Sequence, residues 1–171
     1  MTIRDARPGD AQRIAEIYNH AVAHTTAIWN DELVSVENRA AWIAQRQGDG
    51  FPVIVVADDL DEAVGYATYG PWRPHDGYRH TVEHSVYVRG DQRGRGLGRA
   101  LMEALIARGR AQRMHVMIAA VESSNAASIG LHERLGFENT GTLHQVGEKF
   151  GGWLDLTFLQ LVLDDRATPA G

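Results

Sequence analysis

Apolar residues in the first third of the chain recur with helical spacing. Residues 2–6 predict a short opening strand. One helical face is then marked by five apolar positions, Ile14, Ile17, Tyr18, Ala21 and Val22. Asp10 stands where the N-cap of this helix is expected. A second helix is expected to begin after Ser35 and to carry Trp42 and Ile43.

The rest of the chain alternates between apolar runs and helical patterns. The run "FPVIVVAD" is continuous and bounded by turn residues, which predicts a buried strand. Further strands are expected over 65–70, 83–88, 115–121 and 153–163, with one more after Phe137, and helices over 97–111 and 125–135, the latter closed by Gly136. This order predicts an α+β fold, an α/β sandwich around one mixed sheet.

Composition then limits the class of protein. With 171 residues, 44% hydrophobic and 23% charged, we expect a single domain over 1–171 whose last residues, 165–171, form a frayed tail. The net charge of -5 argues against a nucleic-acid partner. Since there is no cysteine, disulfides and cysteine metal sites are excluded.

Several further classes lack their sequence signals. No stretch approaches the roughly 20 apolar residues of a membrane span, and "MTIRDARPGD" has no signal-peptide core. We therefore expect a cytoplasmic protein without a membrane partner. No H-E-x-x-H or G-x-S-x-G motif is present, and the eight histidines are scattered, so we expect neither a metal nor a hydrolase serine.

The segment "DQRGRGLGRALM" places three glycines among three arginines just before an expected helix. A P-loop needs a lysine here, but Lys149 is the only lysine of the chain. The dinucleotide motif G-x-G-x-x-G needs a glycine where Arg99 stands. The remaining pattern is Arg93-x-x-Gly96-x-Gly98, in which backbone N–H groups at a helix N-terminus wrap an anion. A solvated arginine turn is the alternative interpretation.

This pattern resembles motif A of the GCN5-related N-acetyltransferase (GNAT) superfamily, and "NAASIGLHERLGF" resembles the second half of that family's signature. The resemblance spans residues 3–163. The segments "EIYNHAV", "TVEHSVYV" and "VGEKFGGWLDLTFLQLVL" are similar to the phosphinothricin and methionine sulfoximine acetyltransferase branch. The resemblance implies a mostly antiparallel central sheet flanked by helices, with acetyl-CoA as co-substrate and no metal.

The same resemblance implies direct acetyl transfer, in a ternary complex, to the α-amino group of a small amino acid or analogue. Methionine sulfoximine, methionine sulfone and phosphinothricin are the acceptors it suggests, together with a homodimer and a role in antibiotic or herbicide resistance. Two alternatives stay open. One is a family member acting on a protein N-terminus or a polyamine, and the other is a non-catalytic acyl-CoA-binding module.

The resemblance also assigns residues to the co-substrate. The implied acetyl-CoA contacts are Val86, Tyr87, Val88, Arg93, Gly94, Arg95, Gly96, Leu97, Gly98 and Asn125. Backbone groups of the valine segment would pair with pantetheine as an added strand does, and an N–H near Val88 would polarise the thioester carbonyl. Asn125 is equally well placed as a helix N-cap.

Three residues are catalytic candidates. Glu83 resembles the family's base, and partial burial would raise its pKa toward a useful range. Strand alternation places Glu83 and Tyr87 on one face and the rival base His84 on the other. His132 stands where many family members carry a tyrosine that protonates the leaving thiolate, and Tyr87 is the alternative acid.

The acceptor pocket is expected to draw on an aromatic loop and two separate segments. Its candidate residues are Trp29, Arg73, Asp76, Gly77, Tyr78, Glu83 and Lys149. We expect Arg73 to bind the substrate carboxylate with its planar guanidinium. Lys149 is the candidate for an anionic head group, and Trp29 for a wall of the pocket.

Overall fold

The computed structural model of the protein describes residues 1–169, which divide into two compact units. The first unit consists of Met1–Tyr69 and Ser85–Leu105, and the second of Gly70–His84 and the chain from Ile106 onward. Two elements continue from one unit into the other, strand β4 (Thr81–Val88) and helix α3 (Leu97–Ala111).

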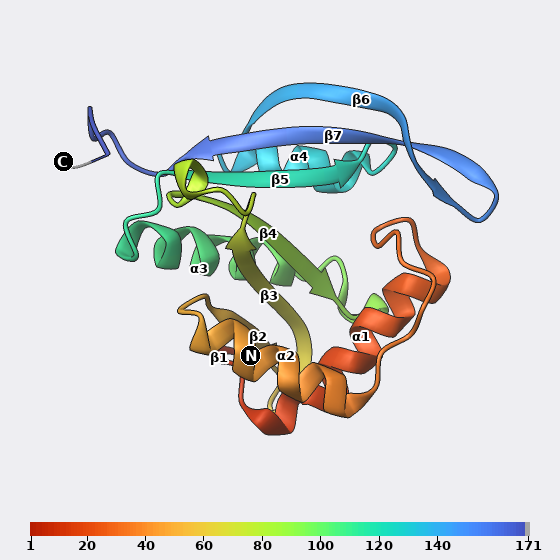
Figure 1. The fold of residues 1–171 in the computed structure, drawn as a ribbon. Helices are drawn as coiled ribbons and strands as arrows, with labels where there is room; N and C mark the ends of the chain where they lie inside the picture. The colour runs from red at the N-terminus through yellow and green to blue at the C-terminus, as the bar shows by residue number, and fades with distance from the viewer. Residues whose placement is uncertain (170–171) are drawn as a thin grey trace. The chain divides into compact units, whose positions relative to one another are not determined.

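In the first unit, β1 (Thr2–Asp5) pairs antiparallel with β2 (Val53–Ala57), and β2 pairs antiparallel with β3 (Ala63–Pro71). Helices α1 (Ala11–His24) and α2 (Val36–Gly48) belong to the same unit, drawn in red to orange in Figure 1. Strand β2 is buried along its whole length, as its continuous apolar run predicted. The hydrophobic core of this unit includes side chains from both helices and from β2 and β3, among them Ile14, Ile17, Ile43, Val53, Val55 and Tyr66.

The starts of the first two helices differ in how they are capped. Asp10 occupies the N-cap position of α1, but the predicted capping bond is wrong. Its carboxylate instead accepts the Arg7 backbone N–H at 2.7 Å and the Arg4 guanidinium at 2.7 and 3.0 Å. The buried ion pair with Arg4 thus competes successfully for the carboxylate. Ser35 does cap α2, because its Oγ accepts the Asn38 N–H at 3.1 Å.

In the second unit, β4 pairs parallel with β5 (Val116–Glu122), and β5 pairs antiparallel with β7 (Gly152–Val162). Strand β7 pairs in turn with β6 (Glu138–Lys149), forming the long blue hairpin of Figure 1. Helix α4 (Ala126–Arg134) precedes β6 in the chain. Its N-cap is Asn125, whose side chain accepts the Ser128 N–H at 3.1 Å, and Gly136 follows it with φ +90°.

The strand order is β1-β2-β3-β4-β5-β7-β6. Of the registers described above, only that of β4 with β5 is parallel, so the predicted α+β fold with a mostly antiparallel sheet is confirmed. The part of the chain that the structure describes also contains three short 3-10 helices, η1 (Pro8–Asp10), η2 (Asp76–Tyr78) and η3 (Gly90–Gln92). The predicted strands and helices are all present, with bounds that shift by a few residues.

The C-terminal segment is tied to the second unit through Arg166. Its guanidinium donates to the Arg113 carbonyl at 2.7 Å and pairs with Asp164 at 3.2 Å. Residues 170–171 of the tail that was expected to fray lie outside the described residues. Within residues 1–169, no helix has the length and apolar character needed to cross a membrane.

Candidate active site

Strand β4 carries both the predicted base and the predicted co-substrate segment. Its parallel ladder with β5 covers Thr81–Glu83 and ends where Glu83 lies opposite Ile118. At the other end of the strand, the Arg89 N–H donates to the Val64 carbonyl at 2.9 Å, which holds β4 against β3. Val86 and Val88 are only half-buried, so they are not simply core residues.

The glycine loop after β4 has the backbone that a bound anion requires. Gly94 and Gly96 have φ values of +75° and +77°, in the left-handed region that favours glycine. A Cβ at either position would meet no atom within 4 Å, so the loop backbone is open. Helix α3 begins at Leu97, and the N–H groups of a helix's first turn have no acceptor inside the helix. Gly98 therefore lies within that first turn, and the loop fits a pyrophosphate.

Two of the three arginines of the loop interact with other side chains. Arg95 donates to the Gln92 side chain, and Arg99 pairs with Glu103 at 2.8 Å. Arg93 is exposed. The arrangement favours binding of an anion by backbone N–H groups, with the arginine charges in a lesser role.

Glu83 is half-buried on β4, in surroundings that suit a base. Burial raises the pKa of its carboxyl, and the positive charge of Arg73 partly opposes that rise. The Arg73 guanidinium is exposed and lies over the Trp72 ring, 5.0 Å from its centroid. A carboxylate of raised pKa takes up a proton more readily near neutral pH.

His84 and His132 form a buried pair that the sequence did not predict. Their Nε2 atoms are 3.0 Å apart, and their rings stack with centroids 5.0 Å apart. The Phe137 ring packs edge-on against both imidazoles, at 5.8 and 5.1 Å. His84 is 8% exposed and His132 1%. The alternation of β4, which puts His84 on the opposite face from Glu83, was the only available signal.

The protonation of the pair follows from its acceptors. The Ser128 carbonyl, 2.7 Å from His132 Nδ1, can only accept, so this Nδ1 carries the proton. In the neutral His132 ring, Nε2 is then an acceptor and receives the N–H of His84 Nε2. His84 Nδ1 is left as a buried acceptor without a hydrogen-bond partner among residues 1–169.

Burial keeps both histidines neutral. It lowers the pKa of His84 to about 3, with a further contribution from the His132 charge. Burial also lowers the pKa of His132, although the bond to Ser128 opposes this. His132 therefore has no N–H left to donate to a leaving thiolate while the pair is intact.

The predicted acceptor residues lie in several places. Trp29 is half-buried and its Nε1–H donates to the Thr26 carbonyl at 2.8 Å. Tyr78, the last residue of η2, packs edge-on against Trp72 at 5.2 Å. Asp76 begins the same turn and is exposed. Lys149 is 5% exposed, with its ammonium 5.1 Å from the Phe150 ring centroid.

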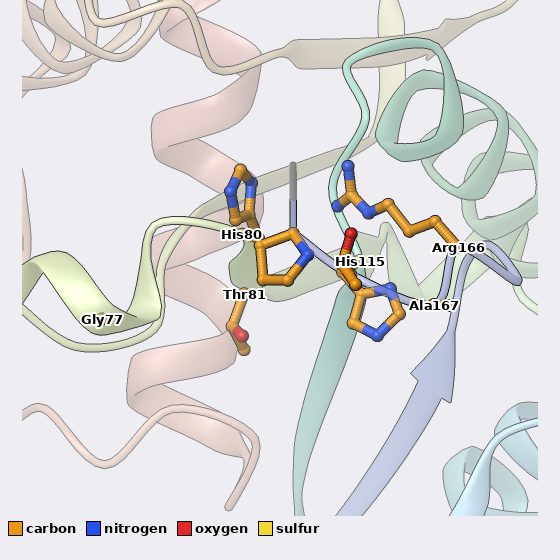
Figure 2. Close-up of a pocket in the computed structure, with 8 residues that line it drawn as sticks. Gly77, His80, Thr81, His115, Arg166 and Ala167 are labelled. Carbon is orange, nitrogen blue, oxygen red and sulfur yellow. The ribbon is translucent and has the colours of Figure 1, made fainter. Parts of the chain in front are cut away.

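Gly77 lines a pocket of about 200 Å³ in the second unit. Figure 2 shows the imidazoles of His80 and His115 and the Arg166 side chain around it. His115 Nδ1 lies 2.7 Å from Oδ1 of Asp164. Neither Glu83 nor His132 contributes to the lining of this pocket. Within residues 1–169, no group of three or more His, Asp or Glu is placed to hold a metal ion.

Comparison with known proteins agrees with this geometry. The model of the acetyltransferase (GNAT) family matches residues 14–137. The L-methionine sulfoximine/L-methionine sulfone acetyltransferase of Pseudomonas aeruginosa is 61% identical over 169 residues, covering 98% of each chain. The phosphinothricin N-acetyltransferase of Streptomyces coelicolor is 35% identical, covering 90% of this chain and 93% of its own.

A solved structure also has a very similar fold. The yncA protein of Salmonella typhimurium, determined with its cofactor acetyl-CoA, has a TM-score of 0.96 at 55% identity, over 99% of this chain and 97% of its own. The predicted fold, the resemblance to this branch, the N-acetyltransferase class and the co-substrate acetyl-CoA are confirmed by these similarities. Because the family model matches well over half of its length, the chain belongs to the acetyltransferase (GNAT) family.

Proposed function

We propose that this N-acetyltransferase acetylates the α-amino group of a small amino acid of the methionine sulfoximine, methionine sulfone or phosphinothricin type. The observation that carries the proposal is Glu83, a half-buried carboxyl of raised pKa three residues before the predicted co-substrate segment. The similarity to enzymes named for these acceptors supports the choice of substrate.

Acetyl-CoA, when bound, supplies the activated acetyl thioester. The residues proposed to hold it are those of the β4 segment and the glycine loop, Val86, Tyr87, Val88, Arg93, Gly94, Arg95, Gly96, Leu97 and Gly98, with Asn125. The left-handed Gly94 and Gly96 and the first turn of α3 present N–H groups for pyrophosphate. A backbone N–H near Val88 polarises the carbonyl that is attacked.

Glu83 acts as the general base. Its carboxylate removes a proton from the acceptor ammonium, either directly or through a water, so that the neutral amine can attack. Arg73, whose charge reaches Glu83, binds the acceptor carboxylate and holds the amine beside the base. Trp29, Asp76, Gly77, Tyr78 and Lys149 are the other proposed acceptor residues.

Tyr87 is the proposed acid for the departing thiolate. Of the two candidates, His132 already donates its Nδ1 proton to Ser128 and accepts at Nε2 from His84. We assign His132 the role of fixing His84, and through it strand β4. Tyr87→Phe is expected to lower kcat by about tenfold or more, since general acid catalysis is worth about 10²–10⁴-fold when fully effective; an unchanged kcat removes Tyr87 as acid.

The substrate proposal is tested by steady-state acetylation of a panel. The panel contains methionine sulfoximine, methionine sulfone, phosphinothricin, ordinary amino acids, a peptide N-terminus and a polyamine. Turnover of the first group supports the proposal, and turnover of only the peptide or the polyamine overturns it. Binding of acetyl-CoA in calorimetry without any turnover would instead identify a non-catalytic acyl-CoA-binding module.

We also propose that the protein is a homodimer. The β6–β7 hairpin exposes a set of apolar side chains, Leu143 (50%), Val146 (51%), Phe150 (66%) and Trp153 (68%), which a second copy would cover. Light scattering of the wild type and of Trp153→Lys tests this, with a shift toward monomer expected in the variant. A monomeric wild type would refute it.

Three further points follow from the same proposal. The chain acts as one domain over 1–171, which the continuity of β4 and α3 through both units supports. It works in the cytoplasm, where acetyl-CoA is available. Acetylation removes the positive charge of a toxic amino-acid analogue, so the gene would protect a sensitive host against antibiotic or herbicide analogues. Growth on methionine sulfoximine or phosphinothricin with and without the gene measures that protection.

A further inference from the structure

Gly65 lies inside a buried strand of the first unit, where a glycine is destabilising. It stands on β3 between Val64 and Tyr66, whose side chains are buried. A glycine in a strand interior has no side chain to pack and loses more conformational freedom on folding than any other residue. The φ of Gly65 lies outside the left-handed region, so other residues can adopt its backbone conformation. A glycine is therefore needed here for space and not for conformation.

The space at Gly65 is limited by three atoms of the neighbouring strands. A Cβ at this position would lie 3.0 Å from the Tyr87 carbonyl oxygen, 3.1 Å from Val56 Cγ1 and 3.2 Å from Val88 Cγ2. Carbon and oxygen atoms in close contacts between strands usually lie about 3.3–3.6 Å apart. Val56 lies directly opposite Gly65 on β2, which is buried along its whole length, so it has no room to recede. An added methyl group would therefore displace the end of β4.

Contacts on both sides of Gly65 hold the end of β4 at this short distance. The Val64 carbonyl accepts the Arg89 N–H at 2.9 Å. The Tyr66 ring packs against the Tyr87 ring, with centroids 5.3 Å apart. The two residues that flank Gly65 thus attach β4 to β3, and the glycine between them allows the close approach.

A β-bulge in β3 stands next to Gly65. In the register of β2 with β3, Val56 lies opposite Gly65 and Ala57 opposite Ala63, so Val64 is one extra residue on β3. The carbonyl of this extra residue is the one that accepts from the end of β4. Bulges bend a strand locally and are frequent next to active sites. The bulge and the glycine are adjacent features of β3 that both determine where β4 lies.

The part of β4 that faces Gly65 belongs to the proposed co-substrate segment. Backbone groups of Val86 to Val88 are proposed to pair with pantetheine, and an N–H near Val88 to polarise the thioester carbonyl. Both roles depend on backbone position, because N–H···O bonds need a donor–acceptor distance of about 2.7–3.2 Å and good alignment. A Cβ at Gly65 would require its neighbours to move by a few tenths of an ångström. A misplacement of about 1 Å in an active site costs up to about 10²-fold in rate, so a smaller shift still has a measurable effect.

We propose that Gly65 is a positioning residue for the co-substrate. Its missing side chain lets the Tyr87–Val88 backbone approach β3, which places the groups that bind pantetheine and polarise the thioester. This inference rests on the proposed function, because it concerns the segment assigned there to acetyl-CoA. It requires no contact between Gly65 and the ligand.

The test compares two ligands by calorimetry. Acetyl-CoA carries the pantetheine arm, whereas ADP carries a pyrophosphate and lacks that arm. For Gly65→Ala, the Kd for acetyl-CoA is expected to rise about three- to tenfold, as for one or two weakened hydrogen bonds, and the Kd for ADP to change by less than about twofold. The kcat at saturating acetyl-CoA is expected to fall by about three- to tenfold. A rise of equal size for both ligands, or an unchanged Kd and kcat with acetyl-CoA, would overturn the proposal.

A double variant separates positioning from core packing. Val56→Ala removes the Cγ1 that crowds Gly65 from β2 and leaves the contact with the Tyr87 carbonyl in place. Gly65→Ala/Val56→Ala is therefore expected to regain part of the Tm lost in Gly65→Ala while still binding acetyl-CoA weakly. If Gly65→Ala alone does not fold, the double variant supplies the comparison with ADP. Restored binding of acetyl-CoA in the double variant would mean that Gly65 acts only through the core, which contradicts the proposal.

Gly109 of α3 offers a matched control. A Cβ there would lie 3.0 Å from Leu163 Cδ1 and 3.4 Å from Met117 Cε, so the crowding is similar but involves only the ends of side chains. Gly109→Ala should leave both Kd values unchanged, and an equal loss in this variant would point to general destabilisation and overturn the role of Gly65. The binding measurements need no acceptor. A wild type that binds acetyl-CoA and acetylates no acceptor of the panel therefore refutes the proposed function alone, which is a distinct outcome.

Discussion

The two faces of strand β4 carry adjacent titratable residues on which burial acts in opposite senses. Glu83 is half-buried and its pKa is raised, whereas His84, 8% exposed, has its pKa lowered to about 3. In both residues the low-dielectric surroundings favour the neutral form. The carboxyl thereby becomes a better proton acceptor near neutral pH, while the imidazole is fixed in one state.

The partners of the two residues reinforce this difference. The exposed charge of Arg73 lowers the pKa of Glu83, and a bound substrate or salt can modify this effect. Among residues 1–169, the His84 side chain has one hydrogen-bond partner, His132, whose own Nδ1 donates to the Ser128 carbonyl. Glu83, the proposed base, must change its charge during catalysis and keeps access to solvent. His84, which supports the strand, is buried.

The largest expected effect comes from removing the base. Glu83→Gln should lower kcat/KM at neutral pH by about 10²–10⁴-fold, because a positioned general base contributes about that much. The loss should shrink at high pH, where the acceptor amine deprotonates without help. Rates from pH 6 to 10 measure both effects. A variant with the wild-type pH profile would show that Glu83 is not the base.

Substitutions in the His84–His132 pair should change the stability of the protein. His132→Leu leaves the Nε2–H of buried His84 without a partner, in addition to the Nδ1 that already lacks one, so we expect a loss of about 1–3 kcal/mol in the free energy of unfolding. His84→Leu removes one unpaired nitrogen while leaving another on His132, and should cost about 1 kcal/mol or less. Urea unfolding of both variants and of the double variant measures the coupling. Equal losses in the two single variants would contradict the assigned hydrogen-bond direction.

Acid should destabilise the protein through the same pair. Because the folded-state pKa of His84 lies below its unfolded value, the unfolded chain binds more protons as the pH falls below about 6.5. The stability contributed by neutral His84 is therefore present above that pH and is lost progressively down to about pH 3. The expected slope is about 1.4 kcal/mol per pH unit for this residue. Urea unfolding between pH 7 and 4 should show a flatter dependence in His84→Leu; parallel curves would argue against it.

The sequence predicted what depends on local pattern and missed what depends on tertiary contact. The positive φ values of Gly94 and Gly96 and the cap at Asn125 follow from residue types at fixed spacing. Strand alternation separated Glu83 from His84. The contact between His84 and His132, 48 residues apart, has no local signature.

Two other features show the same limit. Asp10 was expected to cap α1, but an ion pair with Arg4 takes its carboxylate. The role of Gly65 was not predicted, because one glycine in a strand carries no information about the Tyr87 carbonyl and the Val56 side chain that lie against it. Both depend on which groups meet in space, and periodicity does not determine that.

The smallest expected effect tests whether Glu83 is tuned by its neighbour. Arg73 lowers the pKa that burial raises, so Arg73→Gln should move the pH at which kcat/KM falls on the acidic side to a higher value. High salt should move the acidic limb of the wild type in the same direction by screening this exposed charge, and should have less effect on the variant.

The matched control is Arg79→Gln, which changes an exposed arginine of the same loop and should leave the acidic limb in place. The KM for the acceptor rises in Arg73→Gln if the guanidinium also binds the carboxylate, and fitting the limb separately from KM distinguishes the two roles. An acidic limb that stays fixed in Arg73→Gln would mean that burial alone sets the pKa of Glu83.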